Sequence, residues 1–267
     1  MADTRMTVPA LRALKGQRKI TMLTAYDFLT ARLLDEAGVD CILVGDSLGM
    51  VVLGYDTTLP VTMEEMLHHT KAVRRGVKRA LVIGDMPFGS FQGSVAEAVA
   101  NAARFLKEAG ADAVKLEGGL QVADAVRRMV DVGIPVVGHV GMTPQSVRQY
   151  GGFKVQGRDE ARRREILDGA VALEEAGAFC IILEGVPASL AAEVTARVSV
   201  PTVGIGAGPG CDGQVLVTPD LLGLVEDFKP KFVKRYANLA EQVREAVRAF
   251  AREVQEGTYP SDEHTYH

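Results

Sequence analysis

A lysine and a glutamate lie two residues apart at the end of an apolar segment, in the stretch Ala113-Val-Lys-Leu-Glu-Gly-Gly119. If this stretch is a β-strand, Val114 and Leu116 face one way, and Lys115 and Glu117 face the other way together. Burying an ammonium group and a carboxylate is costly unless the two groups serve a purpose. The stretch is therefore interpreted either as an internal ion pair or as part of a functional site.

Four other apolar segments also end in a polar residue. Three of them end in an acid, at Asp46, Asp85 and Glu184, and the fourth ends at His139. With Glu117, four carboxylates at one place would repel one another unless positive charge lies among them, and Lys115 supplies one such charge. Oxygen ligands with no cysteine nearby predict that a hard divalent cation supplies the rest of the positive charge, with Mg²⁺ preferred over Zn²⁺. The alternatives are that a single acid caps the helix after it, and that His139 only hydrogen-bonds a carbonyl group.

A repeated pattern indicates the architecture. It begins at Glu36, Glu108 and Glu175, and each copy predicts a helix end, a glycine cap, a tight turn and a buried strand. Counting such units along the chain gives eight strands alternating with helices. This favours a (β/α)8 TIM barrel, a parallel sheet closed on itself, as a single domain over residues 1-267. An open doubly wound sheet is disfavoured because no phosphate-binding glycine turn follows the first strand.

The lengths of the predicted loops indicate which end of the barrel carries the active site. Several predicted strand-to-helix loops are long, whereas the helix-to-strand turns are short, and TIM barrels carry their active sites on the former. The acids and His139 would then meet at that end of the barrel. A weak helix is predicted over about 8-14, before the first strand. A helical extension is predicted from Leu221 to about Val254, and residues of about 257-267 are expected to be loose.

Composition excludes several functional classes. The chain has 30 basic and 34 acidic residues and a net charge of -4, which gives no case for binding nucleic acid or a membrane surface. No apolar run reaches membrane-spanning length. Cys41 and Cys180 lie inside apolar segments, where they are expected to pack as small hydrophobic side chains. A reducing, cytoplasmic location is therefore expected.

The predicted site suits carbon–carbon bond chemistry on a 2-oxo acid. A bound Mg²⁺ would hold the carboxylate and keto oxygens of such a substrate and stabilise the enolate formed when a proton leaves C3. A spare carboxylate can remove that proton if its pKa is raised toward neutrality. Glu184 aligns with Glu117 in the repeat, so it is expected in the same cavity and is predicted to be this base.

Several motifs, in order along the chain, resemble those of one known family. They are Leu23-Thr-Ala-Tyr-Asp27, Gly45-Asp-Ser-Leu-Gly-Met50, Asp85-Met-Pro-Phe88, Lys115-Leu-Glu-Gly-Gly119, Gly138-His-Val-Gly141, Gly151-Gly-Phe-Lys-Val-Gln-Gly157, Leu183-Glu-Gly-Val-Pro187, Gly204-Ile-Gly-Ala-Gly208 and Cys211-Asp-Gly-Gln-Val-Leu-Val217. Together they resemble the ketopantoate hydroxymethyltransferase family over roughly Leu11 to Ala240. Because so many motifs occur together, the resemblance is specific.

The resemblance implies a barrel of the phosphoenolpyruvate/pyruvate class. It implies transfer of a hydroxymethyl group from 5,10-methylenetetrahydrofolate to 3-methyl-2-oxobutanoate. The product would be 2-dehydropantoate (ketopantoate), in the synthesis of pantothenate and coenzyme A. It further implies a Mg²⁺ cofactor and a homo-decamer.

The resemblance also implies roles for single residues. Asp46, Asp85 and Glu117 match the family's metal-binding acids, and Glu184 matches its proton acceptor. The candidate substrate-binding residues are Asp46, Ser47, Asp85, Lys115 and His139, the last from its position alone. One departure is Pro219-Asp220, where many members have His before Asp, and this leaves the folate-side contacts open.

Three alternative functions remain at this point. A Schiff-base aldolase would use Lys115 as nucleophile, but the adjacent acids favour its charged form. A metal-dependent 2-oxo-acid lyase or mutase of the same barrel class is the second alternative. A catalytically silent binding protein is the third, and the intact set of acids argues against it. Borohydride trapping, EDTA sensitivity and folate dependence distinguish these alternatives.

Overall fold

The computed structural model describes residues 5–227 and 230–267. The chain divides into two compact units, Met1–Val217 and Thr218–His267, which are considered separately below. The prediction of a single domain over the whole chain stays a prediction. Within the described residues, no helix combines the length and the apolar character that a membrane span requires.

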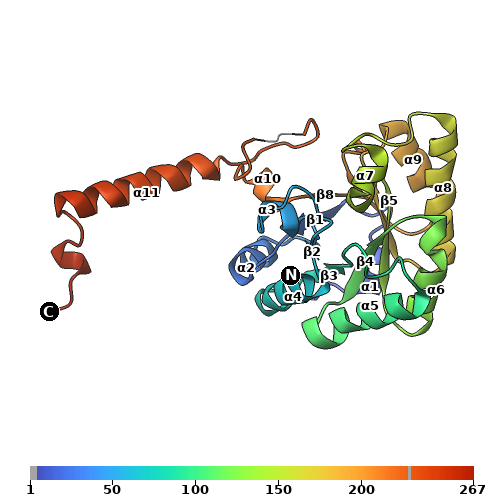
Figure 1. The fold of residues 1–267 in the computed structure, drawn as a ribbon, viewed down its shortest axis with the longest axis horizontal. Helices are drawn as coiled ribbons and strands as arrows, with labels where there is room; N and C mark the ends of the chain where they lie inside the picture. Colours follow the sequence, from blue (N-terminus) through green and yellow to red (C-terminus); the bar gives the residue numbers. More distant parts are fainter. Residues whose placement is uncertain (1–4, 228–229) are drawn as a thin grey trace. The chain divides into compact units, whose positions relative to one another are not determined.

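The first unit contains a closed barrel of eight parallel strands in sequence order, in which β8 pairs with β1 (Figure 1). The strands are β1 Ile20–Thr24, β2 Cys41–Val44, β3 Leu81–Asp85, β4 Ala113–Glu117, β5 Val136–Gly141, β6 Cys180–Glu184, β7 Thr202–Ile205 and β8 Gly213–Leu216. The prediction of a TIM barrel is confirmed.

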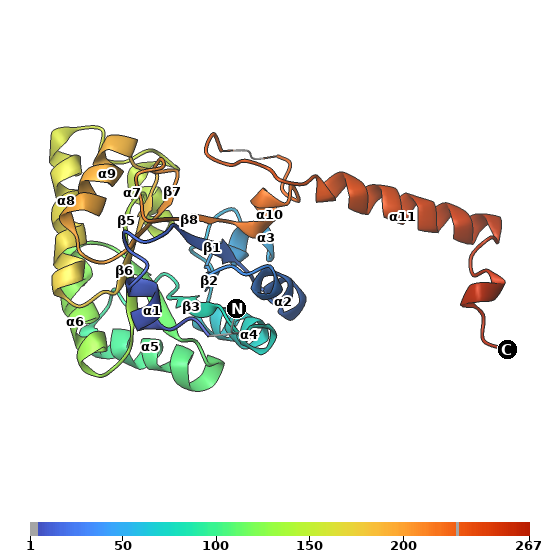
Figure 2. The ribbon, with the colours of Figure 1, turned by 180° about the vertical axis from the view of Figure 1, so that it is seen from behind.

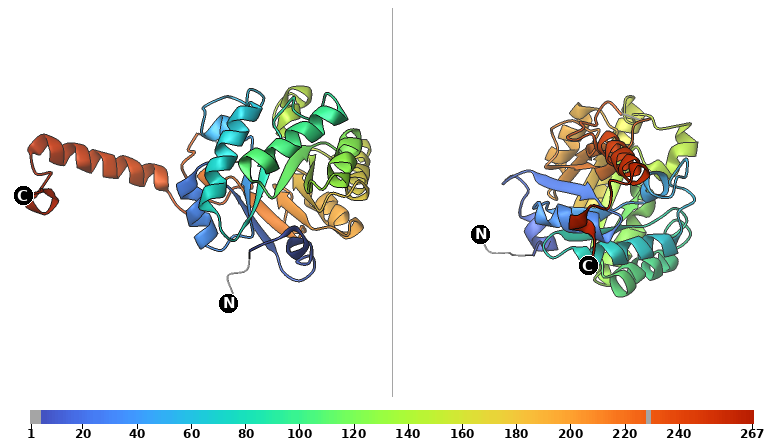
Figure 3. Two further views of the ribbon diagram at one scale, coloured as in Figure 1. Left: turned by 90° about the horizontal axis from the view of Figure 1, so that it is seen from below. Right: turned by 90° about the vertical axis from the view of Figure 1, so that its left-hand side faces the viewer.

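The helices between the strands lie outside the barrel (Figure 2). The longer ones are α2 Phe28–Glu36, α4 Met63–Gly76, α5 Val95–Ala109, α6 Ala123–Asp131, α8 Glu160–Glu175 and α9 Ala188–Arg197. Helices α4 and α5, coloured teal and green, run side by side along the outside of the strands (Figure 3). Helix α4 begins with a capping box, because Thr62 Oγ1 accepts from the Glu65 N–H at 3.2 Å and Glu65 Oε2 accepts from the Thr62 N–H at 2.8 Å.

Short helices occupy the long strand-to-helix loops. Helix α3 Leu48–Val51 follows β2, and η1 Leu120–Val122 follows β4. The segment after β5 contains η2 Pro144–Ser146 and α7 Val147–Tyr150. These loops carry the side chains that surround the site described below.

Alternation along the strands separates two groups of buried side chains. In β4, Val114 and Leu116 belong to the apolar layer between strands and helices, whereas Ala113 belongs to the group inside the barrel. Lys115 and Glu117 alternate with the outer residues and therefore face the barrel interior, as predicted.

The amino-terminal helix α1 Val8–Arg12 contributes to the inner apolar group. It is shorter than the predicted range of about 8-14. Its Leu11 is fully buried and packs with inner side chains such as Ile20 and Met22. Cys41 and Cys180 are buried in the same group as free thiols, which confirms that they pack as small apolar residues.

The second unit contains α10 Thr218–Leu221, α11 Leu239–Glu256 and η3 Asp262–His264. The helical extension predicted from Leu221 therefore begins later, at Leu239. Gly223 in a left-handed conformation and a proline at position 230 explain the interruption, because neither residue continues a helix. The segment 257-267, expected to be loose, contains η3, and the Tyr259 ring lies 5.5 Å from that of Phe250.

Gly141 allows the end of β5 to approach the end of β6. Its φ is +104°, and a Cβ there would lie 2.3 Å from the carbonyl oxygen of Glu184. That oxygen accepts a hydrogen bond from the Met142 N–H at 2.8 Å. The backbone of Glu184 is thus held by a contact that only glycine permits.

We predict that Gly141→Ala lowers the free energy of unfolding by about 3 kcal/mol, the sum of a left-handed backbone penalty and an overpacking penalty. Gly133→Ala is the matched control, because Gly133 has a φ of +89° and no atom within 4 Å of its Cβ position. The control should lose only about 1–2 kcal/mol. Urea unfolding measures both changes, and equal losses would contradict the prediction.

Candidate active site

A small cavity of about 90 Å³ lies at the carboxyl ends of the strands. Every candidate site residue from the sequence lines it. These residues are Asp46, Ser47, Asp85, Lys115, Glu117, His139 and Glu184. The prediction that Glu117 and Glu184 share one cavity agrees with this placement. The individual roles assigned to these residues stay predictions.

Two aspartates lie together at the ends of β2 and β3. Val44 pairs with Gly84 in register, so Asp46 and Asp85 follow at neighbouring positions. The Asp46 N–H donates to Asp85 Oδ2 at 3.0 Å, and both side chains are buried. Burial raises the pKa of Asp85 to about 7; the charge of Lys115 opposes this shift, and that of Asp46 adds to it.

Lys115 is the positive centre of the cavity. Its Nζ lies 2.9 Å from Asp85 Oδ1 and 3.6 Å from Glu117 Oε1. Burial alone lowers the pKa of Lys115, but the nearby acids Asp85, Glu117 and Asp46 outweigh burial and raise it. Lys115 therefore remains an ammonium ion, which argues against a Schiff-base mechanism. Burial raises the pKa of Glu117 well above its usual range, against the opposing charge of Lys115.

The His139 ring lies between the Lys115 ammonium group and the carboxyl of Glu184. Its Nδ1 lies 3.2 Å from Lys115 Nζ, and its Nε2 lies 3.3 Å from Glu184 Oε2. Burial and the charge of Lys115 lower the pKa of His139 well below its usual range, so the ring is neutral. An ammonium group only donates hydrogen bonds, so Nδ1 accepts and Nε2 carries the ring proton. Nε2 is buried and makes no hydrogen bond in the structure, although Glu184 Oε2 is nearby.

Glu184 ends β6 at the edge of the cavity. Its side chain is 17% exposed, more than those of the other acids in the cavity. Burial raises the pKa of Glu184 to about 7, although Lys115 acts in the opposite direction. A carboxyl with this pKa can both accept and release a proton near neutral pH.

Two contacting residues were not identified from the sequence. The Gln145 backbone N–H donates to Glu117 Oε2 at 3.0 Å, and its Nε2 donates to Asp46 Oδ2 and to the Met86 carbonyl oxygen, each at 2.9 Å. The Tyr26 hydroxyl lies 2.8 Å from Ser47 Oγ. Gln145 lies in the loop after β5, and its spacing from the acids carries no signal. Tyr26 lies in the motif Leu23-Thr-Ala-Tyr-Asp27, but a tyrosine at this position does not by itself indicate a role.

The acids do not by themselves form a finished metal site. Among the residues that the structure describes, no three His, Cys, Asp or Glu side chains are arranged to hold a metal ion. Instead, Lys115 contacts the oxygens of Asp85 and Glu117, and the Gln145 amide contacts Asp46. Glu117 Oε1 is buried and accepts no hydrogen bond.

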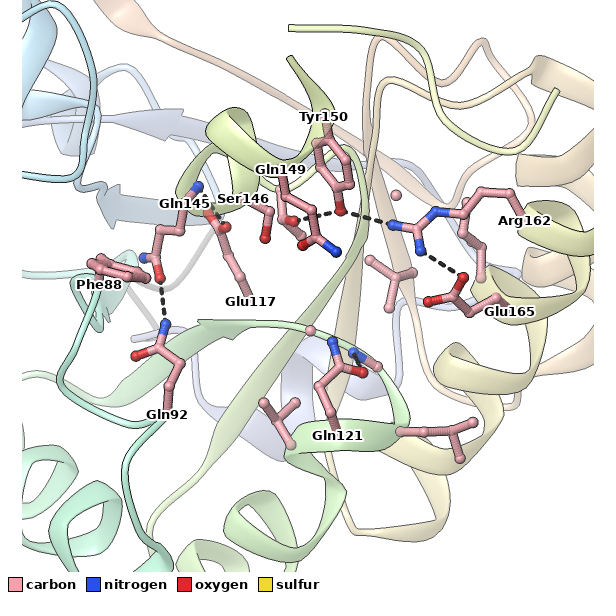
Figure 4. Close-up of a pocket in the computed structure, with 18 residues that line it drawn as sticks. Phe88, Gln92, Glu117, Gln121, Gln145, Ser146, Gln149, Tyr150, Arg162 and Glu165 are labelled. Carbon is pink, nitrogen blue, oxygen red and sulfur yellow. Dashed lines mark hydrogen bonds and ion pairs between the residues drawn. The ribbon is translucent and has the colours of Figure 1, made fainter. Parts of the chain in front are cut away.

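A second, larger cavity of about 460 Å³ adjoins the first. Glu117 lines both cavities, and Gln145 lines the larger one. Figure 4 shows Gln121, Gln149, Tyr150 and Arg162 around the larger one. It lies between the loop after β4, the loop after β5 and the start of α8.

Comparison with known proteins identifies the family. A model of the family described as ketopantoate hydroxymethyltransferase matches residues 5–262. The chain belongs to this family. The 3-methyl-2-oxobutanoate hydroxymethyltransferase of Syntrophus aciditrophicus is 59% identical over 263 residues, which cover 98% of this chain and 97% of that protein. The ketopantoate hydroxymethyltransferases are transferases, and the prediction of the family is confirmed.

Solved structures support the fold of this family member. A phosphonopyruvate hydrolase in complex with oxalate and Mg²⁺ superimposes with a TM-score of 0.62 at 19% identity, over 97% of this chain and 93% of that one. A 2,3-dimethylmalate lyase, described as a PEP mutase/isocitrate lyase superfamily member, gives a TM-score of 0.60 at 17% identity, over 97% and 91%. These superpositions show that the chain has the same fold as both proteins.

Proposed function

We propose that this chain transfers a hydroxymethyl group from 5,10-methylenetetrahydrofolate to 3-methyl-2-oxobutanoate, giving 2-dehydropantoate for pantothenate and coenzyme A synthesis in the cytoplasm. Membership of the family supports the proposal. The observation that carries it is the carboxyl of Glu184, whose pKa is raised to about 7 and which lies in one cavity with Lys115 and Ser47. Such a cavity would supply a base for C3 and hydrogen-bond donors for the oxygens of the oxo acid.

Different side chains would bind the oxo acid and accept its C3 proton. The Lys115 ammonium and the Ser47 hydroxyl would donate hydrogen bonds to the oxo acid, and Tyr26 orients the hydroxyl. Glu184 would take the proton from C3. His139 Nε2 lies 3.3 Å from Glu184 Oε2 without a hydrogen bond in the structure, and donation from Nε2 would favour the ionised carboxyl.

The atoms balance with one water. The C3–H bond breaks with its proton going to Glu184, and C3 forms a bond to the one-carbon unit of the donor. The carbon–nitrogen bonds of the donor break, and water supplies the hydroxyl group to that carbon. The proton from C3 and the second proton of water end on the two folate nitrogens, giving tetrahydrofolate.

We further propose that Asp46 and Asp85 bind Mg²⁺, with Glu117 beside them. The residues fit this ion, because all three supply oxygen donors and Glu117 Oε1 is a buried oxygen without a hydrogen bond. The Mg²⁺ in the related phosphonopyruvate hydrolase structure supports the proposal by analogy of fold. When bound, the ion supplies positive charge next to the oxygens of the oxo acid and so favours loss of the C3 proton. The amide of Gln145 and the ammonium of Lys115 contact these acids and would adjust on binding.

Helix α11 supports a proposal about assembly. Val243, Val247, Phe250 and Val254 are all about half exposed, and their spacing places them along one side of this helix. A stripe of this kind is typical of a contact surface. We propose that the chain forms a homo-oligomer, the homo-decamer that the family resemblance implies.

The first prediction of this proposal concerns the base. Deuterium exchange at C3 of 3-methyl-2-oxobutanoate should rise with pH through about 7, because Glu184 accepts a proton only when ionised. Glu184→Gln keeps the shape and removes the basicity, so exchange should fall by about a hundredfold or more. The exposed Glu175→Gln is the matched control and should keep the wild-type rate and profile. Wild-type exchange in Glu184→Gln would assign the base elsewhere.

The second prediction concerns the metal. Asp85→Asn removes a proposed ligand with little change of volume, and the affinity for Mg²⁺ alone should fall by about tenfold or more. Isothermal titration calorimetry without substrate measures this, and circular dichroism checks the fold. Asp131→Asn, on an exposed position, should bind Mg²⁺ as the wild type does. The assignment fails if Asp85→Asn also does so.

The third prediction concerns assembly. Phe250→Glu places a charge in the apolar stripe, and the oligomer should dissociate at micromolar concentration in multi-angle light scattering. Arg252→Glu, at another exposed position of α11, is the control and should leave the mass unchanged. A monomeric wild type would refute the oligomer, and an intact Phe250→Glu oligomer would refute the role of the stripe.

A further inference from the structure

We propose that Gln145 is a positioning residue, which holds Asp46 and Glu117 in place for the metal ion. This inference rests on the Mg²⁺ site proposed above and assigns a task to a residue outside its set of ligands. Gln145 is only 5% exposed, although glutamine is usually found at protein surfaces. Burying an amide is costly unless its polar atoms have partners, so the contacts of this side chain account for its burial.

Gln145 contacts one oxygen of each of two acids. Its side-chain Nε2 donates to Asp46 Oδ2 at 2.9 Å, and its backbone N–H donates to Glu117 Oε2 at 3.0 Å (Figure 4). The other oxygen of Glu117, Oε1, is buried and accepts no hydrogen bond. Gln145 thus takes a single oxygen from each carboxyl group and leaves the second oxygen for a cation.

The direction of the Gln145 amide is fixed by its neighbours. An amide can be turned end for end, so its direction must come from groups that only donate or only accept. The Gly89 N–H only donates and meets Gln92 Oε1 at 2.8 Å, and Gln92 Nε2 then donates to Gln145 Oε1 at 3.1 Å (Figure 4). At the other end, the Met86 carbonyl oxygen accepts from Gln145 Nε2 at 2.9 Å. Both ends therefore direct the donor Nε2 toward Asp46.

The same contacts limit how far Gln145 can move when an ion binds. Met86 and Gln92 belong to the loop after β3, whereas Gln145 belongs to η2 in the loop after β5. The amide thus joins two loops to Asp46, and three partners restrict it to small adjustments. A carboxylate that is held before the ion arrives loses less conformational entropy on binding, which strengthens the affinity for the ion.

Mg²⁺ depends on such positioning more than Ca²⁺ does. It requires near-octahedral geometry, whereas Ca²⁺ accepts about six to eight oxygen ligands in flexible arrangements. Replacing a residue that orients metal ligands typically changes metal affinity by about 10- to 100-fold. Loss of the Gln145 amide should therefore weaken Mg²⁺ binding more than Ca²⁺ binding. A residue that only supports the fold would affect the two ions alike.

Isothermal titration calorimetry of the whole protein with Mg²⁺ alone, and then with Ca²⁺ alone, tests the inference. Gln145→Met keeps an unbranched side chain of similar length but removes the amide. The affinity for Mg²⁺ should fall by about tenfold or more, and the ratio of the two affinities should shift toward Ca²⁺. Circular dichroism checks that the variant folds.

A second variant changes only the direction of the amide. Gln92→Glu, at an exposed position, keeps an acceptor for the Gly89 N–H but provides no donor for Gln145 Oε1. It should also weaken Mg²⁺ more than Ca²⁺, although an added negative charge alone would strengthen the binding of both ions. Gln121→Glu is the matched control, because Gln121 is exposed and its Oε1 likewise accepts a backbone N–H, from Gly119 at 3.2 Å. This control should weaken neither ion.

The outcomes separate this inference from the proposed function. Wild-type Mg²⁺ affinity in Gln145→Met, or equal losses of Mg²⁺ and Ca²⁺, would show that Gln145 does not position the acids, and the metal site would stand. Wild-type affinity in Gln92→Glu would overturn the orientation of the amide by Gln92, and this variant decides if Gln145→Met does not fold. If the wild type binds no Mg²⁺, the metal site and this inference both fail, and deuterium exchange at C3 then tests the transfer reaction separately.

Discussion

The buried ammonium group of Lys115 is the interaction on which the site depends. It lies in a cavity with Asp46, Asp85, Glu117 and Glu184, where unpaired carboxylates would be costly to bury. Register explains its position, because Asp85 pairs directly with Lys115 on the neighbouring strand. The sheet therefore fixes this ion pair through its backbone, and a flexible lysine side chain is held near 2.9 Å from its partner.

Lys115 carries one positive charge among four acids. Bound protons or a cation must therefore neutralise the rest of the negative charge. Burial raises the pKa values of Asp85 and Glu184 to about 7, and it lowers the pKa of His139. Each shift favours the neutral form, as expected where water is excluded. Because burial disfavours net charge in this cavity, a bound cation or the gain of a proton would each stabilise the carboxyl groups. This links the packing of the barrel to the chemistry proposed for it.

Much of this arrangement could be predicted from the sequence. Each copy of the repeat of helix end, glycine and buried strand is one short contiguous stretch, so local pattern alone indicated the barrel and placed the acids at one end of it. The contacts of Gln145 could not be predicted in this way. They depend on how the loop after β5 folds back over β2 and β4, which no local spacing records. The interruption before α11 was missed because Gly223 lies within an otherwise helical pattern.

The wall of the small cavity has two sides of different character, which matters for redesign. Glu117 lines both cavities, so a substitution there would alter both. Ile182, Ile205 and Val215 form an apolar part of the wall and do not line the larger cavity. Shortening Ile182 or Val215 would enlarge the small cavity and leave the larger one unchanged. With the oxo acid in the small cavity, as proposed, such variants would accept bulkier 2-oxo acids.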